Sequence, residues 1–169
     1  YIVQSLYRVV LRKPPLVFFQ NEEDRRLFVQ ARLVKDEKAR RIPGSGVDLC
    51  RFKALPDEFS AKRRATRFLL AGRLLWDKCV GEFVQAARVL KSRYPKVEFH
   101  VIGFSDVQNP SAISRTYIDK WESEGVIVYC GSTDDIRPYY LDADCVVLPS
   151  YREGVPRTLL EAAAMGVPI

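Results

Sequence analysis

From about residue 66 to its end, the chain alternates between short apolar runs and amphipathic stretches of helix length. Short apolar runs bounded by glycine or polar residues are typical of buried strands, and apolar residues spaced by three or four positions predict helices. The pattern predicts strands within residues 67–75, 97–104, 126–131 and 144–150. It predicts helices within residues 81–95, 111–125, 134–143 and 156–166, and residues 167–169 indicate the start of a further strand.

Buried strands that alternate with helices favour a parallel sheet, because right-handed crossovers then cover both of its faces. The predicted fold is therefore an α/β, Rossmann-like, doubly wound parallel sheet with helices on both faces. Ligands bind such sheets beyond the carboxyl ends of the strands. We expect a ligand site in the strand-to-helix loops, at residues 72–78, 103–110, 131–135 and 150–158.

Residues 1–65 do not follow this rhythm. The stretch YIVQSLYRVVLRKPP is suited to an amphipathic helix, and residues 15–21 and 22–34 predict a strand and a helix, followed by the glycine-rich loop IPGSGVD. We interpret residues 1–50 as the tail of a preceding domain with an interdomain connection. Residues 51–169 are then an incomplete Rossmann-like domain that stops in the middle of its sheet.

The chain is basic, with 27 Lys and Arg against 21 Asp and Glu and a formal net charge of +6. This balance favours an anionic partner such as a phosphorylated ligand, a membrane surface or nucleic acid, although solvated helix faces also explain basic clusters. No RRM, KH or helix-turn-helix pattern supports nucleic-acid binding. No GxGxxG or P-loop motif follows a strand, which disfavours a nicotinamide dehydrogenase or a P-loop protein.

The cysteines and the single histidine offer no metal site. The four cysteines form no CxxC pair and have no histidine at zinc spacing, which fits small core residues in a reducing compartment. His100 lies in the apolar run VEFHVIG and is expected to be structural. No apolar stretch reaches the roughly 18–20 residues that a transmembrane helix needs.

Two segments carry the candidate chemistry. In the loop at residues 72–78, after the first strand of the predicted Rossmann-like sheet, Arg73 and Lys78 can converge on one diphosphate. The arginine acts as a planar fork and the lysine as a point charge. The alternative is a pair of solvated loop cations. In SYREGVPRTLLEAAAMG, at residues 150–166, Pro156 suits the first helical turn, so the next backbone amides form an anion site.

Two acids frame this second segment. Glu153 precedes the helix, and Glu161 lies inside it, on the order of 7–8 Å along the helix axis from Pro156. Carboxylates accept hydrogen bonds from sugar hydroxyls. A ligand that touches both acids and the amides between them carries phosphate in its middle and hydroxyls at both ends, as a nucleotide sugar does. The alternative is a loop acid at 153 and a solvated helix residue at 161.

The segment LPSYREGVPRTLLEAAAMGVP resembles the donor-binding signature of the family-4 retaining glycosyltransferases, which have the GT-B fold. The likeness extends upstream through IPGSGVDLCRF, FLLAGRLLWDK, VEFHVIG, NPSAIS and GSTDDIRPYYLDADCVVLPS, and so covers most of the chain from about residue 16. In detail the chain is similar to bacterial members that build capsule, O-antigen or lipid-linked oligosaccharides. These include enzymes that add N-acetylhexosamines to undecaprenyl-diphosphate-linked acceptors.

The resemblance implies a role for each matching residue. It implies that the donor diphosphate contacts Arg73, Lys78 and the segment of Arg157, Thr158 and Leu159, and that the base lies beside Thr133 and Asp135. It further implies that Glu153 and Gly154 contact the transferred sugar, that Glu161 binds the ribose, and that Gly46 lies in the glycine loop at the interdomain cleft. It implies retention of anomeric configuration without metal or cofactor, because the two cations neutralise the leaving diphosphate.

Three positions depart from the family pattern. Cys79 stands where members usually have glycine, and Val155–Pro156 stand where an aromatic residue and glycine are common. A complete enzyme of this type has an N-terminal Rossmann domain with the acceptor site and a catalytic histidine or its equivalent. His100 matches no catalytic position, so we expect no catalytic residue in this chain and no turnover by the chain alone.

The expected function is that of the donor-binding domain of a retaining glycosyltransferase. Such an enzyme transfers a hexose or N-acetylhexosamine from a nucleotide diphosphate sugar, with UDP favoured over GDP, to a lipid-linked bacterial surface glycan. The alternative is a nucleotide-sugar-binding or interaction module without activity. Expected partners are the donor, a glycan or polyprenyl-diphosphate acceptor and the N-terminal domain. The expected location is the cytoplasm, with peripheral contact at the inner face of the cytoplasmic membrane.

Overall fold

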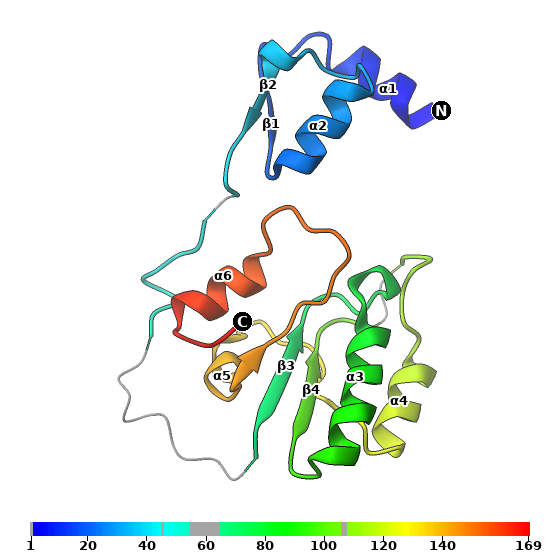
Figure 1. The fold of residues 1–169 in the computed structure, drawn as a ribbon, viewed down its shortest axis with the longest axis vertical. Coiled ribbons are helices and arrows are strands. Elements are labelled where there is room, and N and C mark those ends of the chain that lie inside the picture. The colour runs from blue at the N-terminus through cyan, green and yellow to red at the C-terminus, as the bar shows by residue number, and fades with distance from the viewer. Residues whose placement is uncertain (1, 45, 55–64, 106–107) are drawn as a thin grey trace. The chain divides into compact units, whose positions relative to one another are not determined.

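The computed structural model describes residues 2–44, 46–54, 65–105 and 108–169 (Figure 1). The chain forms two compact units, one of residues 1–46 with 153–156 and one of residues 47–152 with 157–169. Each unit has its own hydrophobic core. Within the described ranges, no helix has the length and apolar character needed to cross a membrane.

The first unit holds a two-stranded parallel sheet with two helices. Its elements are α1 (Ile2–Val10), β1 (Val17–Phe19), α2 (Glu22–Gln30), the 3-10 helix η1 (Asp36–Lys38) and β2 (Ala39–Arg41). The N-terminal helix, the strand and the second helix expected from the sequence are confirmed. β2 was not predicted, because its two arginines interrupt any apolar run; it pairs in parallel with β1 instead.

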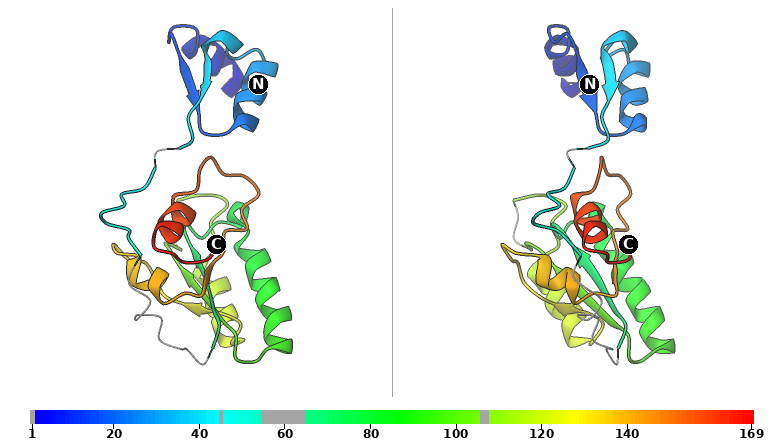
Figure 2. Two further views of the ribbon diagram at one scale, coloured as in Figure 1. Left: turned by 60° about the vertical axis from the view of Figure 1, so that its left-hand side comes forward. Right: turned by 90° about the vertical axis from the view of Figure 1, so that its left-hand side faces the viewer.

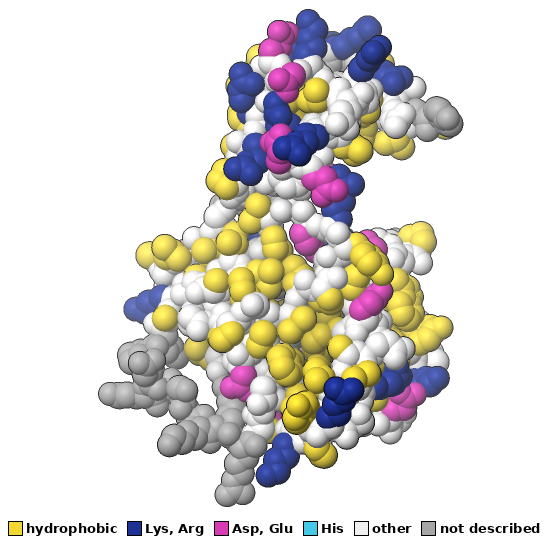
Figure 3. Space-filling model, in the orientation of Figure 1, with side chains coloured by type: hydrophobic (Ala, Val, Ile, Leu, Met, Phe, Trp, Pro, Cys, Tyr) yellow, Lys and Arg dark blue, Asp and Glu magenta, His cyan; other side chains and the backbone are white. Residues whose placement is uncertain are grey.

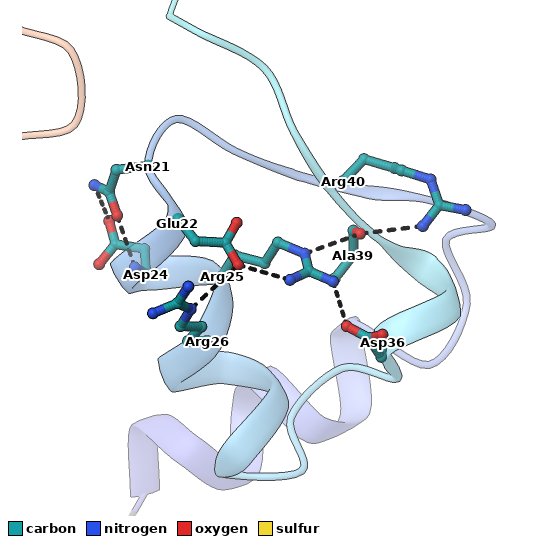
Figure 4. Close-up of polar contacts among 8 residues, drawn as sticks. All are labelled: Asn21, Glu22, Asp24, Arg25, Arg26, Asp36, Ala39 and Arg40. Carbon is teal, nitrogen blue, oxygen red and sulfur yellow. Dashed lines mark hydrogen bonds and ion pairs between the residues drawn. The ribbon is translucent and has the colours of Figure 1, made fainter.

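Arg25 holds the elements of the first unit together (Figure 4). Its guanidinium donates to the carbonyl oxygen of Ala39 at 3.3 Å and to a carboxylate oxygen of Glu22 at 2.8 Å, and it also pairs with Asp36. One side chain thus ties α2 to η1 and β2. Many other Lys and Arg side chains of this unit cover its surface (Figure 3), which suits the solvated interpretation of its basic clusters.

The second unit is a parallel sheet of four strands in the order β5-β4-β3-β6. Its elements are β3 (Arg67–Ala71), the 3-10 helix η3 (Trp76–Lys78), α3 (Val80–Arg93), β4 (Glu98–Ile102), α4 (Arg115–Ser123), β5 (Val128–Tyr129), α5 (Arg137–Leu141), β6 (Cys145–Val146) and α6 (Arg157–Ala164). All pairings within this sheet are parallel, which agrees with the predicted fold class.

Helices cover both faces of this sheet (Figures 1 and 2). Successive strand residues point to opposite faces, so Leu70 enters a core with Phe83 of α3 and Trp121 of α4. Leu69, on the other face, enters a core with residues of α5 and α6, among them Tyr140. The loops at the carboxyl end of the sheet are therefore held between two packed layers.

The strands are shorter than the apolar runs predict. β3 ends at Ala71, because the chain turns at Gly72, and the buried Leu74 and Leu75 belong to the following loop. The expected strand at 167–169 is wrong for the described structure: these residues form no strand, although the Val146 amide donates to the Pro168 carbonyl oxygen at 2.8 Å. A single such bond does not make a ladder.

Candidate functional site

A cavity of about 280 Å³ lies at the carboxyl edge of the second unit's sheet. It is bounded by the exits of β3 and β4, the loop after β5, and helices α5 and α6. The lining residues are Ala71, Gly72, Arg73, Ile102, Gly103, Phe104, Ser132, Thr133, Ile136, Tyr140, Thr158 and Glu161. This is the edge where a doubly wound sheet is expected to bind its ligand.

Two glycines form the part of the cavity between the strand exits. Gly72 and Gly103 follow the paired residues Ala71 and Ile102, with φ values of +156° and +153°. A Cβ atom on Gly103 would lie 1.7 Å from the carbonyl oxygen of Gly72. Only glycine fits at this approach, and the missing side chains leave the backbone open to a ligand.

Arg73 follows Gly72 directly, is exposed and lines the cavity. Lys78 ends η3 and is not among the described residues that line it. Cys79, the next residue, is buried and takes the left-handed conformation, with a φ of +57°. Glycine adopts this conformation without strain, which gives a physical reason for the glycine that the family pattern favours at this position.

The loop between Arg73 and Lys78 is fixed by a neighbouring segment. The hydroxyl of Ser111 donates to a carboxylate oxygen of Asp77 at 2.8 Å, and the amide of Trp76 donates to the Ser111 carbonyl oxygen at 2.8 Å. Leu75 also forms an antiparallel bridge with Ala112. The loop that carries the two expected diphosphate ligands is thus held at its centre.

Glu161 is buried, with 8% of its surface exposed, although it is charged and lies on a short helix. The Tyr140 hydroxyl donates to its Oε2 at 3.1 Å, and the Arg157 guanidinium donates to its Oε1 at 3.2 Å. The alternative of a solvated residue at 161 is therefore wrong. Burial, reinforced by the adjacent carboxylate, raises the pKa of Tyr140 far above its ordinary value, so its hydroxyl keeps its proton.

Thr133 lines the cavity in the loop after β5. Its hydroxyl donates to the carbonyl oxygen of Asp135 at 3.0 Å and accepts from the Asp135 amide at 3.1 Å. The Asp135 carboxylate is paired with Arg137, whose hydrogen bonds lower the pKa of Asp135 to about 2. Asp135 is not among the described residues that line the cavity, so only Thr133 of this pair faces it.

The start of α6 forms another side of the cavity. Thr158 lines the cavity, Arg157 extends into solvent apart from its bond to Glu161, and Leu159 packs against the second unit's core. Leu159 can thus offer a ligand only its backbone amide. That amide lies in the first turn of α6, where backbone N–H groups have no partner within the helix.

The three other candidate residues belong to the first unit. The Glu153 carbonyl oxygen accepts from the Asn21 side chain at 3.0 Å, and Gly154 lies against Gln20. Gly46 has a φ of +74°, a value that favours glycine. None of the three is among the residues that line the cavity. The structure therefore brings together Arg73, Thr133, Thr158 and Glu161, and the role of each stays a prediction.

Sequence reasoning assigned no role to Tyr140 or Phe104, two residues that line this cavity. Tyr140 lies in the predicted helix DDIRPYYLDA, but nothing in that pattern shows which of its two tyrosines turns inward. Phe104 is the last residue of the predicted strand 97–104 and also lies in the loop 103–110, where a ligand site but no aromatic contact was expected. In the structure it is exposed beside the cavity rather than part of the core.

Residues 65–169 match the family model of the group 1 glycosyl transferases. The chain belongs to this family. The match covers every residue that lines the cavity. The family predicted from the two-glutamate segment and its upstream motifs is thereby confirmed.

Two curated relatives illustrate the family. The chain is 30% identical to the N,N'-diacetylbacillosaminyl-diphospho-undecaprenol alpha-1,3-N-acetylgalactosaminyltransferase of Campylobacter jejuni, over 98% of the chain and 44% of that protein. It is 27% identical to the UDP-Gal:alpha-D-GlcNAc-diphosphoundecaprenol alpha-1,3-galactosyltransferase of Escherichia coli, over 88% of the chain and 40% of that protein. The chain thus spans less than half the length of both relatives.

Among solved structures, the chain is similar to Anabaena Alr3699/HepE in complex with UDP. The TM-score is 0.78 at 22% identity, and the match covers 98% of this chain and 48% of that one. At this identity the likeness concerns the fold alone. It confirms the predicted fold class, an α/β chain that corresponds to about half of a GT-B glycosyltransferase.

Proposed function

We propose that the cavity binds the nucleoside diphosphate of a sugar donor. One observation carries this proposal: the buried carboxylate of Glu161 is held by Tyr140 at the same cavity that Arg73 lines. A fixed carboxylate suits a pair of ribose hydroxyls, and a guanidinium at an open strand exit suits phosphate oxygens. A ligand with both groups a few bonds apart is a nucleoside diphosphate.

The remaining contacts follow from the family resemblance. We propose that Lys78 and the amides of Arg157, Thr158 and Leu159 join Arg73 at the diphosphate, with Thr133 and Asp135 beside the base. Glu153 and Gly154 would contact the transferred sugar, and Gly46 would belong to the glycine loop that the resemblance implies. The two cations would stabilise the charge that develops on the leaving diphosphate.

For the whole protein, we propose retaining transfer of a hexose or N-acetylhexosamine from a UDP-sugar to a lipid-linked bacterial glycan. Both relatives are named for diphospho-undecaprenol acceptors, one is named for UDP-Gal, and the solved structure holds UDP. Such an acceptor would bring the enzyme to the inner face of the cytoplasmic membrane as a peripheral protein.

Calorimetric titration of the chain with UDP and GDP tests the site. We expect Arg73→Ala and Glu161→Ala each to weaken UDP binding by about 10- to 150-fold, because each removes a charge-assisted hydrogen bond. Lys96→Ala and Glu124→Ala remove exposed charges outside the cavity and serve as matched controls. Unchanged affinity in the Arg73 and Glu161 variants would refute the site.

Transfer itself is tested with the complete gene product, a UDP-sugar and a polyprenyl-diphosphate-linked acceptor. We expect a product whose anomeric configuration, read by NMR, equals that of the donor. A folded protein that binds UDP but transfers no sugar from any hexose or N-acetylhexosamine donor would instead support a binding module without activity.

A further inference from the structure

Phe104 is an apolar side chain that belongs to none of the hydrophobic cores of the described residues. It follows Gly103 at the exit of β4, has 59% of its surface exposed, and lines the cavity. Among the described residues, aromatic rings such as Phe68 and Phe99 stack in pairs, but Phe104 belongs to no such pair. Its ring is therefore open to whatever the cavity holds.

The sheet places this ring next to the arginine. Ala71 pairs with Ile102, so Arg73 and Phe104 occupy equivalent positions two residues beyond that pair, on neighbouring strand exits. The amide of Leu74 donates to the Phe104 carbonyl oxygen at 3.2 Å, which holds the two exits together. Backbones of neighbouring strands run about 4.8 Å apart. Arg73, the expected phosphate-binding residue, and Phe104 therefore leave the sheet side by side.

The sheet order places Phe104 between the arginine and the loop after β5. Because β4 lies between β3 and β5, Phe104 stands between Arg73 on one side and Thr133 on the other. Ile136, which is partly buried, is another apolar residue that lines the cavity. The cavity thus offers charged groups, a flat ring and an aliphatic side chain.

We propose that Phe104 stacks on the nucleobase of the donor. This inference rests on the proposed function, and it adds a residue that binds the base through its π-face. Stacking of a base on an aromatic side chain is tolerant of base identity, because every base has such a face. Phe104 would therefore distinguish a nucleotide from a base-free ribose diphosphate, while polar groups of the cavity would distinguish one base from another.

The test compares UDP with ribose 5-diphosphate, which lacks the base, by calorimetry on the chain and its variants. We expect Phe104→Ala to weaken UDP binding by about 5- to 150-fold, the usual range for loss of one stacked base. Binding of ribose 5-diphosphate should stay unchanged, and Phe104→Trp should retain UDP binding. Tyr94→Ala removes an equally exposed ring, at the end of α3 and outside the cavity, as the matched control.

The outcomes separate this inference from the proposed function. If Arg73→Ala weakens UDP binding but Phe104→Ala does not, the stacking role is refuted and the donor site stands. If Phe104→Ala weakens both ligands equally, the residue shapes the cavity and does not stack, which also refutes the inference. If the unaltered chain binds neither ligand, both proposals fail. A nuclear Overhauser contact between the Phe104 ring and uracil H5 or H6 would support the stacking directly.

Discussion

The hydroxyl of Tyr140 donates a hydrogen bond to Oε2 of Glu161 across 3.1 Å, from a side chain with no exposed surface. Burial and the adjacent carboxylate raise the pKa of Tyr140, so this hydroxyl remains a donor throughout the physiological pH range. Arg157 binds the other carboxylate oxygen. Each oxygen of Glu161 thus has one donor within the protein, and its remaining lone pairs are available to ribose hydroxyls.

Tyr140→Phe should therefore weaken UDP binding by up to about 10- to 150-fold, since a hydrogen bond to a charged group contributes about 1.5–3 kcal/mol. The ring still fills its place in the core, so the loss reflects the orientation of the Glu161 carboxylate. Calorimetric titration measures the affinity, and urea unfolding measures the stability. Tyr139→Phe, at the partly buried neighbouring tyrosine, is the control. Equal UDP affinities for wild type and Tyr140→Phe would show that Glu161 needs no support from the tyrosine.

The close approach of Gly103 to Gly72 gives a second prediction. Gly103→Ala would place a Cβ atom 1.7 Å from a backbone oxygen at a φ of +153°, so backbone must move. We expect the free energy of unfolding to fall by at least about 3 kcal/mol. Gly125→Ala is the control, because its φ is +65° but no atom lies within 4 Å of the added Cβ. That variant should lose only about 1 kcal/mol, and equal losses would contradict the steric argument.

Much of the fold could be predicted because periodicity and packing agree over most elements. α3 shows helical spacing, and its Phe83, Val84 and Ala87 enter the core, whereas its Val89 is exposed. Strand ends were less predictable: the run RFLLAGRLL has two further leucines after Ala71, so only Gly72 and Arg73 mark the turn. β2 was missed because a strand of two exposed arginines owes its place to pairing with β1, which no local pattern encodes.

The candidate site was predictable only in part, for a similar reason. Arg73 and Glu161 stand in motifs whose spacing relates them to a strand exit and a helix start. Tyr140, one of the two partners of Glu161, lies 21 residues away on another helix, so only tertiary structure reveals this contact. Phe104 looked like the end of an apolar strand, and its exposure depends on where β4 stops.

The bond between Ser111 and Asp77 gives a third prediction. Ser111→Ala removes the hydroxyl that holds Asp77 in the centre of the loop after Arg73. Because the bonded side chains are exposed, we expect a stability loss of no more than about 1 kcal/mol. A freer loop should weaken UDP binding severalfold. Ser92→Ala, which removes a hydroxyl bonded to Val89 on the surface of α3, is the control. Identical UDP affinities in the two variants would show that the loop keeps its shape without this bond.

The only histidine of the chain provides a pH prediction. His100 is half-buried, its Nε2 lies 3.1 Å from a carboxylate oxygen of Glu98, and its Nδ1 lies 3.6 Å from the Cys130 sulfur. Burial lowers the pKa of His100, the positive charges of Arg67 and Lys91 lower it further, and Glu98 opposes them only in part. The folded state therefore binds this proton less readily than the unfolded state does.

Stability should consequently rise with pH through the range just below the unfolded histidine pKa of about 6.5, and it should fall as the solution is acidified through that range. The pKa of Glu98 is lowered, chiefly by its hydrogen bond from Arg67. Protonation of Glu98 therefore also reduces stability as the pH falls, but only below about pH 5, near the ordinary pKa of a glutamate. Urea unfolding at pH 7.5 and 5.5 measures the difference in the free energy of unfolding between the two pH values. His100→Gln should reduce this difference. Above pH 7.5, the free energy of unfolding should depend on pH in the same way for both proteins. If His100→Gln leaves the difference between the two pH values unchanged, other groups cause the acid sensitivity. If the unaltered protein is more stable at pH 5.5 than at pH 7.5, the attraction of Glu98 raises the pKa of His100 by more than burial lowers it.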